Sequence, residues 1–353
     1  MKKTEFKVLG VMSGTSLDGI DLAVVNFRKS NSWQFEIEIG QTVPYSAKWK
    51  TILTEALHYN EEDLKKVNRE YTVYLAEAIN RFKAENNLEK LDAVCSHGHT
   101  IKHEPVNRYT LQIGNLPEIA TLIKERVVCD FRVQDVVLGG QGAPLVPIGD
   151  ELLFHEYDYC LNLGGFANIS TMQDFRIAYD ICPVNTVLNF YAEKLGFAYD
   201  DKGNIARSGK IDSELLEKLQ QLEYYKKAAP KSLGIEWVNA QIFSILKHYE
   251  EDIPSILHTF SHHIALQIVQ NLDDSQSSKL LITGGGSFNT FLIELIQKKT
   301  KTKIIIPSEE IINYKEALIF GFLGVLKLLD ENNVLSSVTG ASHDHSSGVI
   351  FEP

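Results

Sequence analysis

Two glycine-containing loops, one in each half of the chain, constrain the fold because each separates two segments that are typical of β-strands. The first loop covers residues 14–19, and the second contains Gly164 and Gly165. The flanking apolar segments are residues 6–12 and 20–27 for the first loop, and residues 157–163 and 167–172 for the second. Folds that bind phosphate at a P-loop or a dinucleotide fingerprint run from strand to helix instead. Two strand-to-strand loops therefore favour two related lobes, each built on a hairpin.

The remaining segments extend each half into an α/β unit. Residues 33–39 alternate between apolar and polar side chains, which predicts a third strand after the first hairpin. Further strands are expected at residues 91–96, 127–131, 176–180, 279–283 and 303–306. Helices are expected at residues 48–58, 61–85, 116–125, 187–195, 213–227, 237–249, 255–271, 289–299 and 315–329. This order predicts an α/β fold with mixed sheets and a nucleotide cleft between two lobes.

The boundary between the lobes is expected in a loop, because no low-complexity linker separates the two halves. The expected N-terminal lobe comprises residues 1–132 and 335–353, and the expected C-terminal lobe comprises residues 133–334. This division requires the C-terminal tail to return to the first lobe.

Composition excludes several classes of protein. The 353 residues carry a formal net charge of -11, which argues against the basic surface of a non-specific nucleic-acid binder. Backbone amides in a glycine loop can still bind an anion locally. The apolar run 317–326 is too short to span a bilayer, so no membrane partner is expected. Four cysteines without a CxxC pair predict reduced thiols and a cytoplasmic location.

The glycine loops are the candidate nucleotide-binding elements, and the alternative for each is a plain turn. A third loop, at residues 284–286, follows a predicted strand and leads into a predicted helix, where an anion or polar group is favoured. Small residues allow close approach of an oxyanion to the backbone, and hydroxyls add donors. The expected ATP- and phosphate-binding residues are Ser13, Gly14, Thr15, Ser16, Leu17, Asp18, Gly19, Gly164, Gly165, Asn168, Gly284, Gly285 and Gly286.

Four carboxylates are candidates for acid–base chemistry: Asp130, Asp135, Asp180 and Glu316. Asp130 and Asp180 end predicted strands, where ligands bind in open α/β sheets. A carboxylate there could accept a proton from an attacking hydroxyl or water, although a turn or cap role is the alternative for each.

Two groups of histidines are also candidates for a site. The group at residues 97–103 follows a strand and would suit either a polar pocket or a surface loop. His258 and His262 share a helix face, but the H-E-x-x-H context of a zinc site is missing. The side-chain motifs therefore predict no resident metal.

An ordered series of motifs runs along nearly the whole chain. It comprises residues 10–19 (GVMSGTSLDG), Ser96-His97-Gly98, Thr100, His103-Glu104-Pro105, residues 110–114 (TLQIG), Asp130-Phe131-Arg132, residues 139–147, Gly164-Gly165, residues 284–289, Glu316-Ala317 and residues 338–342 (VTGAS). By these motifs the chain resembles the anhydro-N-acetylmuramic acid kinases, sugar kinases of the actin–hexokinase superfamily. The resemblance implies a two-lobed actin-like ATPase fold, which is ribonuclease H-like.

The resemblance also implies a reaction. The family uses ATP and water on 1,6-anhydro-N-acetylmuramic acid, a product of cell-wall recycling, and forms N-acetylmuramic acid 6-phosphate. The catalytic base is the Asp that opens the family's Asp-x-Gly-Pro-Gly-Asn motif, which corresponds to Asp180 here. Magnesium would accompany the ATP. The implied substrate-binding residues are His97, Asp130, Arg132, Asn185 and Glu316. The superfamily also contains homodimers, although no stretch of this sequence marks an interface.

This chain departs from the family pattern on the sugar side. Cys182 and Val184 replace both glycines of Gly-Pro-Gly, and His99 replaces the usual Gln. Val133-Gln134 and Ile235 stand where the family usually has arginines, which are bidentate partners for phosphate or carboxylate. Two alternatives therefore stay open: a diverged kinase for another amino sugar, and a non-catalytic ATP-binding protein on the same fold.

Overall fold

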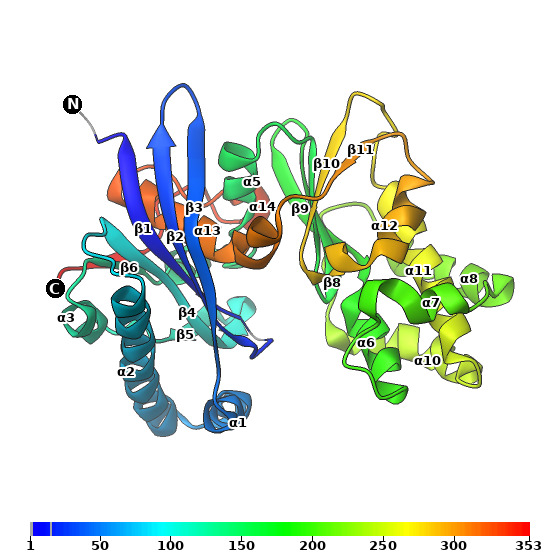
Figure 1. Ribbon diagram of the computed structural model, residues 1–353, viewed down its shortest axis with the longest axis horizontal. Coiled ribbons are helices and arrows are strands. Elements are labelled where there is room, and N and C mark those ends of the chain that lie inside the picture. The colour runs from blue at the N-terminus through cyan, green and yellow to red at the C-terminus, as the bar shows by residue number, and fades with distance from the viewer. Residues whose placement is uncertain (1–2, 15) are drawn as a thin grey trace. The chain divides into compact units, whose positions relative to one another are not determined.

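The computed structural model describes residues 3–14 and 16–353, which divide into two compact units (Figure 1). Unit 1 comprises Met1–Leu153 and Tyr314–Pro353, and unit 2 comprises Phe154–Asn313. The sequence suggested that residues 133–153 and 314–334 belong to the C-terminal lobe. In the structure they group with unit 1 instead. The reason is tertiary packing: a Cβ on Gly149 would lie 2.7 Å from the side chain of Ile319, so these two segments are in close contact.

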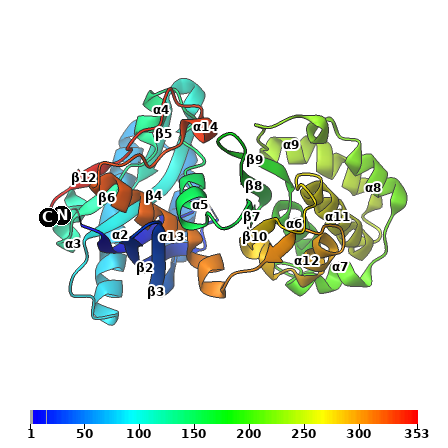
Figure 2. The ribbon, with the colours of Figure 1, turned by 90° about the horizontal axis from the view of Figure 1, so that it is seen from above.

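Unit 1 is built on a seven-stranded sheet with the order β12-β6-β4-β1-β2-β3 and β5 paired with β4. Its strands are β1 (Glu5–Ser13), β2 (Gly19–Lys29), β3 (Trp33–Pro44), β4 (Ala93–Glu104), β5 (Tyr109–Ile113), β6 (Val127–Cys129) and β12 (Val349–Phe351). The first three form an antiparallel meander, and β4 and β6 add parallel strands beside β1. Strand β12 pairs antiparallel with β6 (Figure 2), so the tail returns to the first unit as predicted.

Unit 2 repeats this topology with five strands in the order β11-β10-β7-β8-β9. They are β7 (Tyr159–Leu163), β8 (Phe166–Met172), β9 (Arg176–Pro183), β10 (Lys279–Thr283) and β11 (Lys303–Ile305). Again three strands form an antiparallel meander, and two parallel strands extend the sheet from the first. Both predicted hairpins are confirmed, since Ser13 pairs with Ile20 and Leu163 pairs with Ala167.

The helices are α1 (Ala47–Glu55), α2 (Glu61–Glu85), α3 (Glu118–Ile123), α4 (Val133–Val137), α5 (Pro147–Leu153), α6 (Asn185–Lys194), α7 (Asn204–Ser208), α8 (Ser213–Gln220), α9 (Ile235–Trp237), α10 (Ser244–Leu246), α11 (Ile253–Val269), α12 (Thr290–Gln297), α13 (Glu309–Leu328) and α14 (Ser336–Thr339). The predicted helix 213–227 was too long, because Leu222 turns to an extended conformation after α8. The predicted helix 237–249 is interrupted by a π-helical segment, Val238–Phe243. Sequence reasoning missed β5, β12, α4, α5, α7 and α14.

Helix α13 approaches strand β1 closely enough to require glycine at the contact. A Cβ on Gly10 would lie 1.9 Å from the carbonyl oxygen of Ala317, which is far inside any real contact distance. On the other face of the sheet, α2 and α3 cover an apolar core that includes Leu9, Val11 and Tyr71. The sheet of unit 1 is therefore packed on both faces.

We expect Gly10→Ala to lower the free energy of unfolding by about 3 kcal/mol, because an overpacked contact against backbone cannot relax by a rotamer change. Urea unfolding of the purified proteins measures this. Gly321→Ala is the matched control on the α13 side of the same contact, because its nearest neighbour would be a methyl group of Val8 at 3.3 Å. Equal stability of the two variants would contradict the packing described here.

Candidate active site

A cavity of about 400 Å³ in unit 1 brings the first glycine loop together with several predicted sugar-binding residues. Its lining includes Ser13, Gly14, Ser16, His97, Arg132 and Glu316. The volume is in the range of small-molecule binding sites. Thr15, predicted in the same loop, lies outside the described residues. Strand β4 contributes His97, the segment after β6 contributes Arg132, and α13 contributes Glu316.

Arg132 is a fixed cation at this cavity. Its Nε donates to His97 Nε2 at 2.8 Å, and its Nη1 donates to the carbonyl oxygen of Gly142 at 2.6 Å. Burial lowers the pKa of Arg132 to about 10, while the nearby carboxylates of Glu316 and Asp135 oppose this shift. The guanidinium therefore stays charged at neutral pH, and its remaining N–H groups can bind a carboxylate or phosphate.

His97 is held as a neutral acceptor. Its Nδ1 lies 2.9 Å from the carbonyl oxygen of Gly98 and donates to it, which leaves Nε2 free to accept from Arg132. Burial and then the Arg132 charge keep the pKa of His97 well below its ordinary value. His97 is thus suited to orienting Arg132 and not to acting as a proton donor.

Two predicted carboxylates differ in their relation to the cavity. Glu316 lines it, and removal from water raises the pKa of Glu316 while the Arg132 charge opposes the shift. Asp130 ends β6 with a left-handed φ of 60°, and burial raises its pKa. Such backbone strain is concentrated at functional positions, but Asp130 is not among the residues that line the cavity.

Ser13 is anchored from behind by a buried polar cluster. Its Oγ lies 2.8 Å from His99 Nδ1, accepts from the Tyr71 hydroxyl at 3.0 Å and also bonds to the Tyr45 hydroxyl. The serine hydroxyl is therefore used inside the protein, and the cluster fixes the start of the glycine loop. Sequence reasoning missed both tyrosines, because neither belongs to a recognisable motif.

The other residues of the first loop divide into exposed and structural positions. Ser16 and Asp18 are exposed. Leu17 adopts a φ of 58° and packs against the core of unit 1. Gly19 is required by packing, since a Cβ there would lie 2.5 Å from the Val43 carbonyl oxygen. The exposed positions are therefore the ones available to a ligand.

In unit 2, Asp180 is a half-buried carboxylate with both oxygens oriented by hydrogen bonds. Asn168 lies opposite Asp180 on the neighbouring strand, and its side-chain amide donates to Oδ1 at 2.9 Å. The backbone N–H of Leu233 donates to Oδ2 at 2.9 Å. Asn168, expected at a phosphate, thus supports the predicted base. The Leu233 contact was not predicted, because it depends on a loop far away in sequence.

The remaining glycine positions of unit 2 meet around Leu163. The backbone N–H of Asn185 donates to the Gly164 carbonyl, and its side chain donates to the Leu163 carbonyl at 3.4 Å. Gly284 adopts a φ of 80°, and a Cβ there would lie 2.4 Å from Asn162 Oδ1. Gly165 and Gly285 are exposed, whereas Gly286 is buried. The second and third glycine loops therefore lie side by side with accessible backbone.

The two family departures beside Asp180 do not add side chains to this surface. Cys182 and Val184 are both fully buried and belong to the hydrophobic core of unit 2. A bulge in the β8–β9 pairing puts Cys182 opposite the core residue Ala167, while Asp180 stays opposite Asn168, so Cys182 points to the other face from Asp180.

The described part of the chain comprises residues 3–14 and 16–353. In that part of the chain, no helix is both long and apolar enough to cross a membrane. The same residues contain no group of three or more His, Cys, Asp or Glu side chains arranged to hold a metal ion. His258 and His262 stack at 4.9 Å between ring centroids, and His258 Nδ1 bonds to the Ala206 carbonyl oxygen.

The two units share one strand topology, each with a glycine hairpin, and confirm the predicted α/β fold with mixed sheets. Solved structures similar to this chain include an activator of 2-hydroxyisocaproyl-CoA dehydratase from Clostridium difficile with bound ADPNP. It has 10% identity and a TM-score of 0.44 over 92% of this chain and 97% of that one. A hexokinase from Schistosoma mansoni complexed with glucose has 11% identity and a TM-score of 0.36, over 91% and 87% of the chains.

The family is shown by sequence comparison. The family model for anhydro-N-acetylmuramic acid kinase matches residues 6–353. The enzyme of that name from Actinobacillus pleuropneumoniae serotype 7 is 32% identical, covering 97% of this chain and 98% of the relative. Its counterpart from Saccharophagus degradans is 34% identical over 98% of both. The chain belongs to the anhydro-N-acetylmuramic acid kinase family.

The buried His99 predicts a measurable acid sensitivity. Burial lowers the pKa of His99 to about 4, so the folded protein binds fewer protons than the unfolded chain as the pH falls below the usual histidine pKa of about 6.5. The stability contributed by neutral His99 is therefore lost as the pH falls from about 6.5 toward 4. We expect His99→Gln to lose about 2 kcal/mol less stability than the wild type between pH 7.5 and pH 5.

Urea unfolding at the two pH values measures this difference. His58→Gln, at an exposed histidine, is the matched control and should follow the wild type. A His99→Gln protein with wild-type pH dependence would show that His99 is not held neutral by the fold.

Proposed function

We propose that this chain catalyses the ATP-dependent hydrolytic opening and phosphorylation of 1,6-anhydro-N-acetylmuramic acid. Family membership supports the reaction class, and one observation supports the site. The glycine loop, a fixed Arg132 cation, neutral His97 and Glu316 share one cavity in unit 1. A sugar that carries both hydroxyls and a carboxylate suits these groups, since hydrogen-bond acceptors and a guanidinium are both present.

The proposed roles in unit 1 follow from its geometry. Arg132 binds the carboxylate of the sugar, and His97 holds the guanidinium in place by accepting from Nε. Glu316, at the same cavity, accepts hydrogen bonds from sugar hydroxyls. The backbone amides of half-buried Gly14 and exposed Ser16 bind phosphate. Asp130 stays a proposed substrate contact on the strength of its strained position at the end of β6.

Asp180 is the proposed general base. It takes a proton from water, whose oxygen bonds to the anomeric carbon of the sugar while the bond from that carbon to O6 breaks. O6 then bonds to the γ-phosphorus of ATP, and ADP leaves. The hydrogen bonds from Asn168 and Leu233 hold the carboxylate in one orientation for this step. The loops at Gly164 and Gly284 are the proposed nucleotide contacts of unit 2, and Asn185, whose backbone N–H bonds to the Gly164 carbonyl, stays a proposed substrate contact.

Magnesium is the expected companion of ATP. Mg²⁺ keeps several waters and uses one or two carboxylates together with phosphates, so a preformed three-ligand group is not required. Asp18 and Asp21 fit this need, because the pKa of Asp21 is raised by burial and further by the neighbouring Asp18 charge. A cation there would relieve that repulsion. Bound Mg²⁺ would neutralise charge on the phosphates during transfer.

The proposed setting is the cytoplasm, where ATP is available and thiols stay reduced. All four cysteines are free and buried, which is compatible with a reducing compartment. The proposed partners are ATP and the amino sugar, and homodimer formation stays a prediction.

The reaction is tested by coupled ADP release with purified 1,6-anhydro-N-acetylmuramic acid, with product identification by mass spectrometry. We expect the wild-type protein to form the 6-phosphate with one oxygen derived from water, and Asp180→Asn to lower kcat about 10³-fold or more because the base is lost. ATP binding by Asp180→Asn should persist. Asp174→Asn, in the exposed turn between β8 and β9, is a control for the charge change. Wild-type turnover by Asp180→Asn would contradict the role of Asp180 as the general base.

A diverged sugar specificity is the second candidate function. It is favoured by Val133 and Ile235, which stand at positions where the family usually has arginine and are 37% and 46% exposed. A panel of amino sugars and anhydro-sugars ranked by kcat/KM separates the two candidates. Preference for a substrate without the lactyl carboxylate would favour the second. ATP binding without turnover on every sugar would instead favour a non-catalytic protein.

A further inference from the structure

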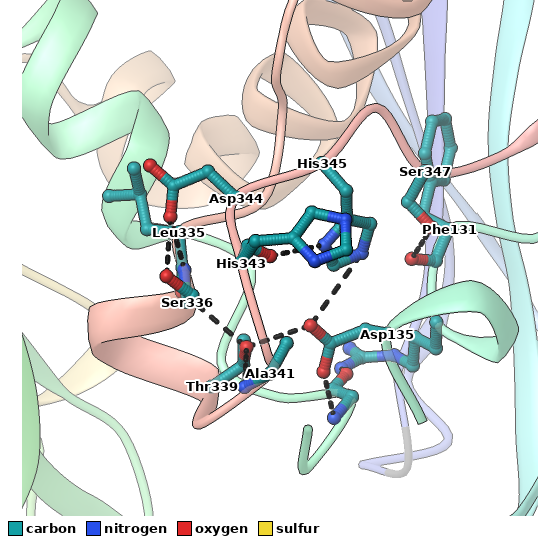
Figure 3. Close-up of polar contacts among 12 residues, drawn as sticks. Phe131, Asp135, Leu335, Ser336, Thr339, Ala341, His343, Asp344, His345 and Ser347 are labelled. Carbon is teal, nitrogen blue, oxygen red and sulfur yellow. Dashed lines mark hydrogen bonds and ion pairs between the residues drawn. The ribbon is translucent and has the colours of Figure 1, made fainter. Parts of the chain in front are cut away.

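A buried hydrogen-bonded cluster connects the C-terminal segment, residues 335–347, to the loop that follows Arg132 (Figure 3). Its centre is Asp135 on α4, whose side chain is fully buried. Asp135 Oδ1 accepts from the Thr339 hydroxyl at 2.7 Å, and Oδ2 accepts from the backbone N–H of Gly142 at 2.6 Å. A buried carboxylate is stable only when its oxygens are satisfied, so both contacts are needed.

Gly142 transmits this constraint to the cavity. Its N–H donates to Asp135, while its carbonyl oxygen accepts from Arg132 Nη1 at 2.6 Å. Gly142 adopts a φ of 68°, and a Cβ there would lie 2.8 Å from the side chain of Val136, so its place is closely defined. One peptide group thus bonds to the buried anion on one side and to the site cation on the other.

The C-terminal segment fixes the same loop at further points. The backbone N–H of Gln141 donates to the Thr339 carbonyl at 2.8 Å, and the N–H of Ser342 donates to the Leu138 carbonyl at 3.1 Å. The Ser347 hydroxyl donates to the carbonyl of Phe131, the residue before Arg132, at 2.7 Å. These contacts bracket residues 131–142 at both ends.

His345 completes the surroundings of Asp135. Its Nε2 lies 3.7 Å from Asp135 Oδ1, and the ring is buried (Figure 3). The Asp135 carboxylate therefore has Thr339, His345 and the Gly142 amide around it. Thr339 and His345 both belong to the C-terminal segment.

We infer that Asp135 and Thr339 are positioning residues for the sugar site, and that the C-terminal segment sets the orientation of Arg132 through Gly142. The inference rests on the proposed role of Arg132 as the partner of the sugar carboxylate. A purely structural role for the cluster would lower stability without separating sugar binding from ATP binding, and this difference makes the inference testable.

Thr339→Val keeps the shape of the side chain and removes the hydroxyl that Asp135 needs. We expect the KM for the anhydro-sugar to rise about tenfold. This change corresponds to the loss of one hydrogen bond between the Arg132 guanidinium and the sugar carboxylate. The KM for ATP and the kcat should stay within about twofold, because the predicted loss concerns one contact to the sugar and not the transition state. Thr339→Ser should restore the wild-type value. Steady-state kinetics with each substrate varied in turn measure the split.

The Ser336 hydroxyl lies on the same short helix, α14, but it donates to Asp344 at 2.7 Å and not to Asp135. Ser336→Ala is therefore the matched control. Its sugar KM should equal that of the wild type. If Thr339→Val does not fold, Ser347→Ala carries the test with a smaller rise in sugar KM. A wild-type sugar KM in the folded variant, or an equal rise for ATP, would overturn the inference.

A second readout does not depend on turnover. Hydrogen–deuterium exchange of residues 131–142 should become faster in Thr339→Val and stay unchanged in Ser336→Ala, because release of Asp135 frees the loop. Unchanged exchange in Thr339→Val would overturn the inference. Absence of turnover by the wild-type protein would count against the proposed function instead, so the two failures are distinguishable.

Discussion

The close approach of α13 to β1 is the contact on which the rest of unit 1 depends. Gly10 leaves no room for a side chain against the Ala317 carbonyl, so helix and strand meet backbone to backbone. Since Glu316 precedes Ala317, this contact puts a carboxylate beside the loop that follows β1. Farther along the helix, the Phe320 ring lies 4.6 Å from that of His97 and 6.0 Å from the Arg132 guanidinium. The close contact between α13 and β1 therefore positions three residues that line the cavity: Glu316, His97 and Arg132.

The two charged groups of Arg132 and Asp135 belong to one connected series of hydrogen bonds in unit 1. Neutral His97 accepts from Arg132, Arg132 donates to Gly142, and Gly142 donates to buried Asp135. The opposite charges of Arg132 and Asp135 offset each other, which reduces the cost of burying either one. Because each group has its hydrogen bonds satisfied by the next, the guanidinium has little freedom to reorient before a ligand arrives. Preorganisation of this kind favours binding of a carboxylate or phosphate.

The Asp180 carboxylate of unit 2 is also held in one orientation by hydrogen bonds. A neighbouring-strand amide and a loop N–H each satisfy one carboxylate oxygen. The flanking positions Cys182 and Val184 serve the core, so the departures from the family pattern there alter packing and not the exposed surface. Because a bulge in β9 separates the direction of Cys182 from that of Asp180, the motif can replace its glycines with core side chains while Asp180 keeps its place.

The sequence by itself determined most of the longer elements and the family. Apolar runs and glycine positions are local patterns, so both hairpins and α2 with its predicted bounds could be read directly. Only the tertiary structure decided which partners the site residues have. Thr339 and Asp135 are 204 positions apart, and Leu233 is 53 positions from Asp180. Contacts over such separations depend on how the whole chain packs, and no local pattern in one sequence encodes them.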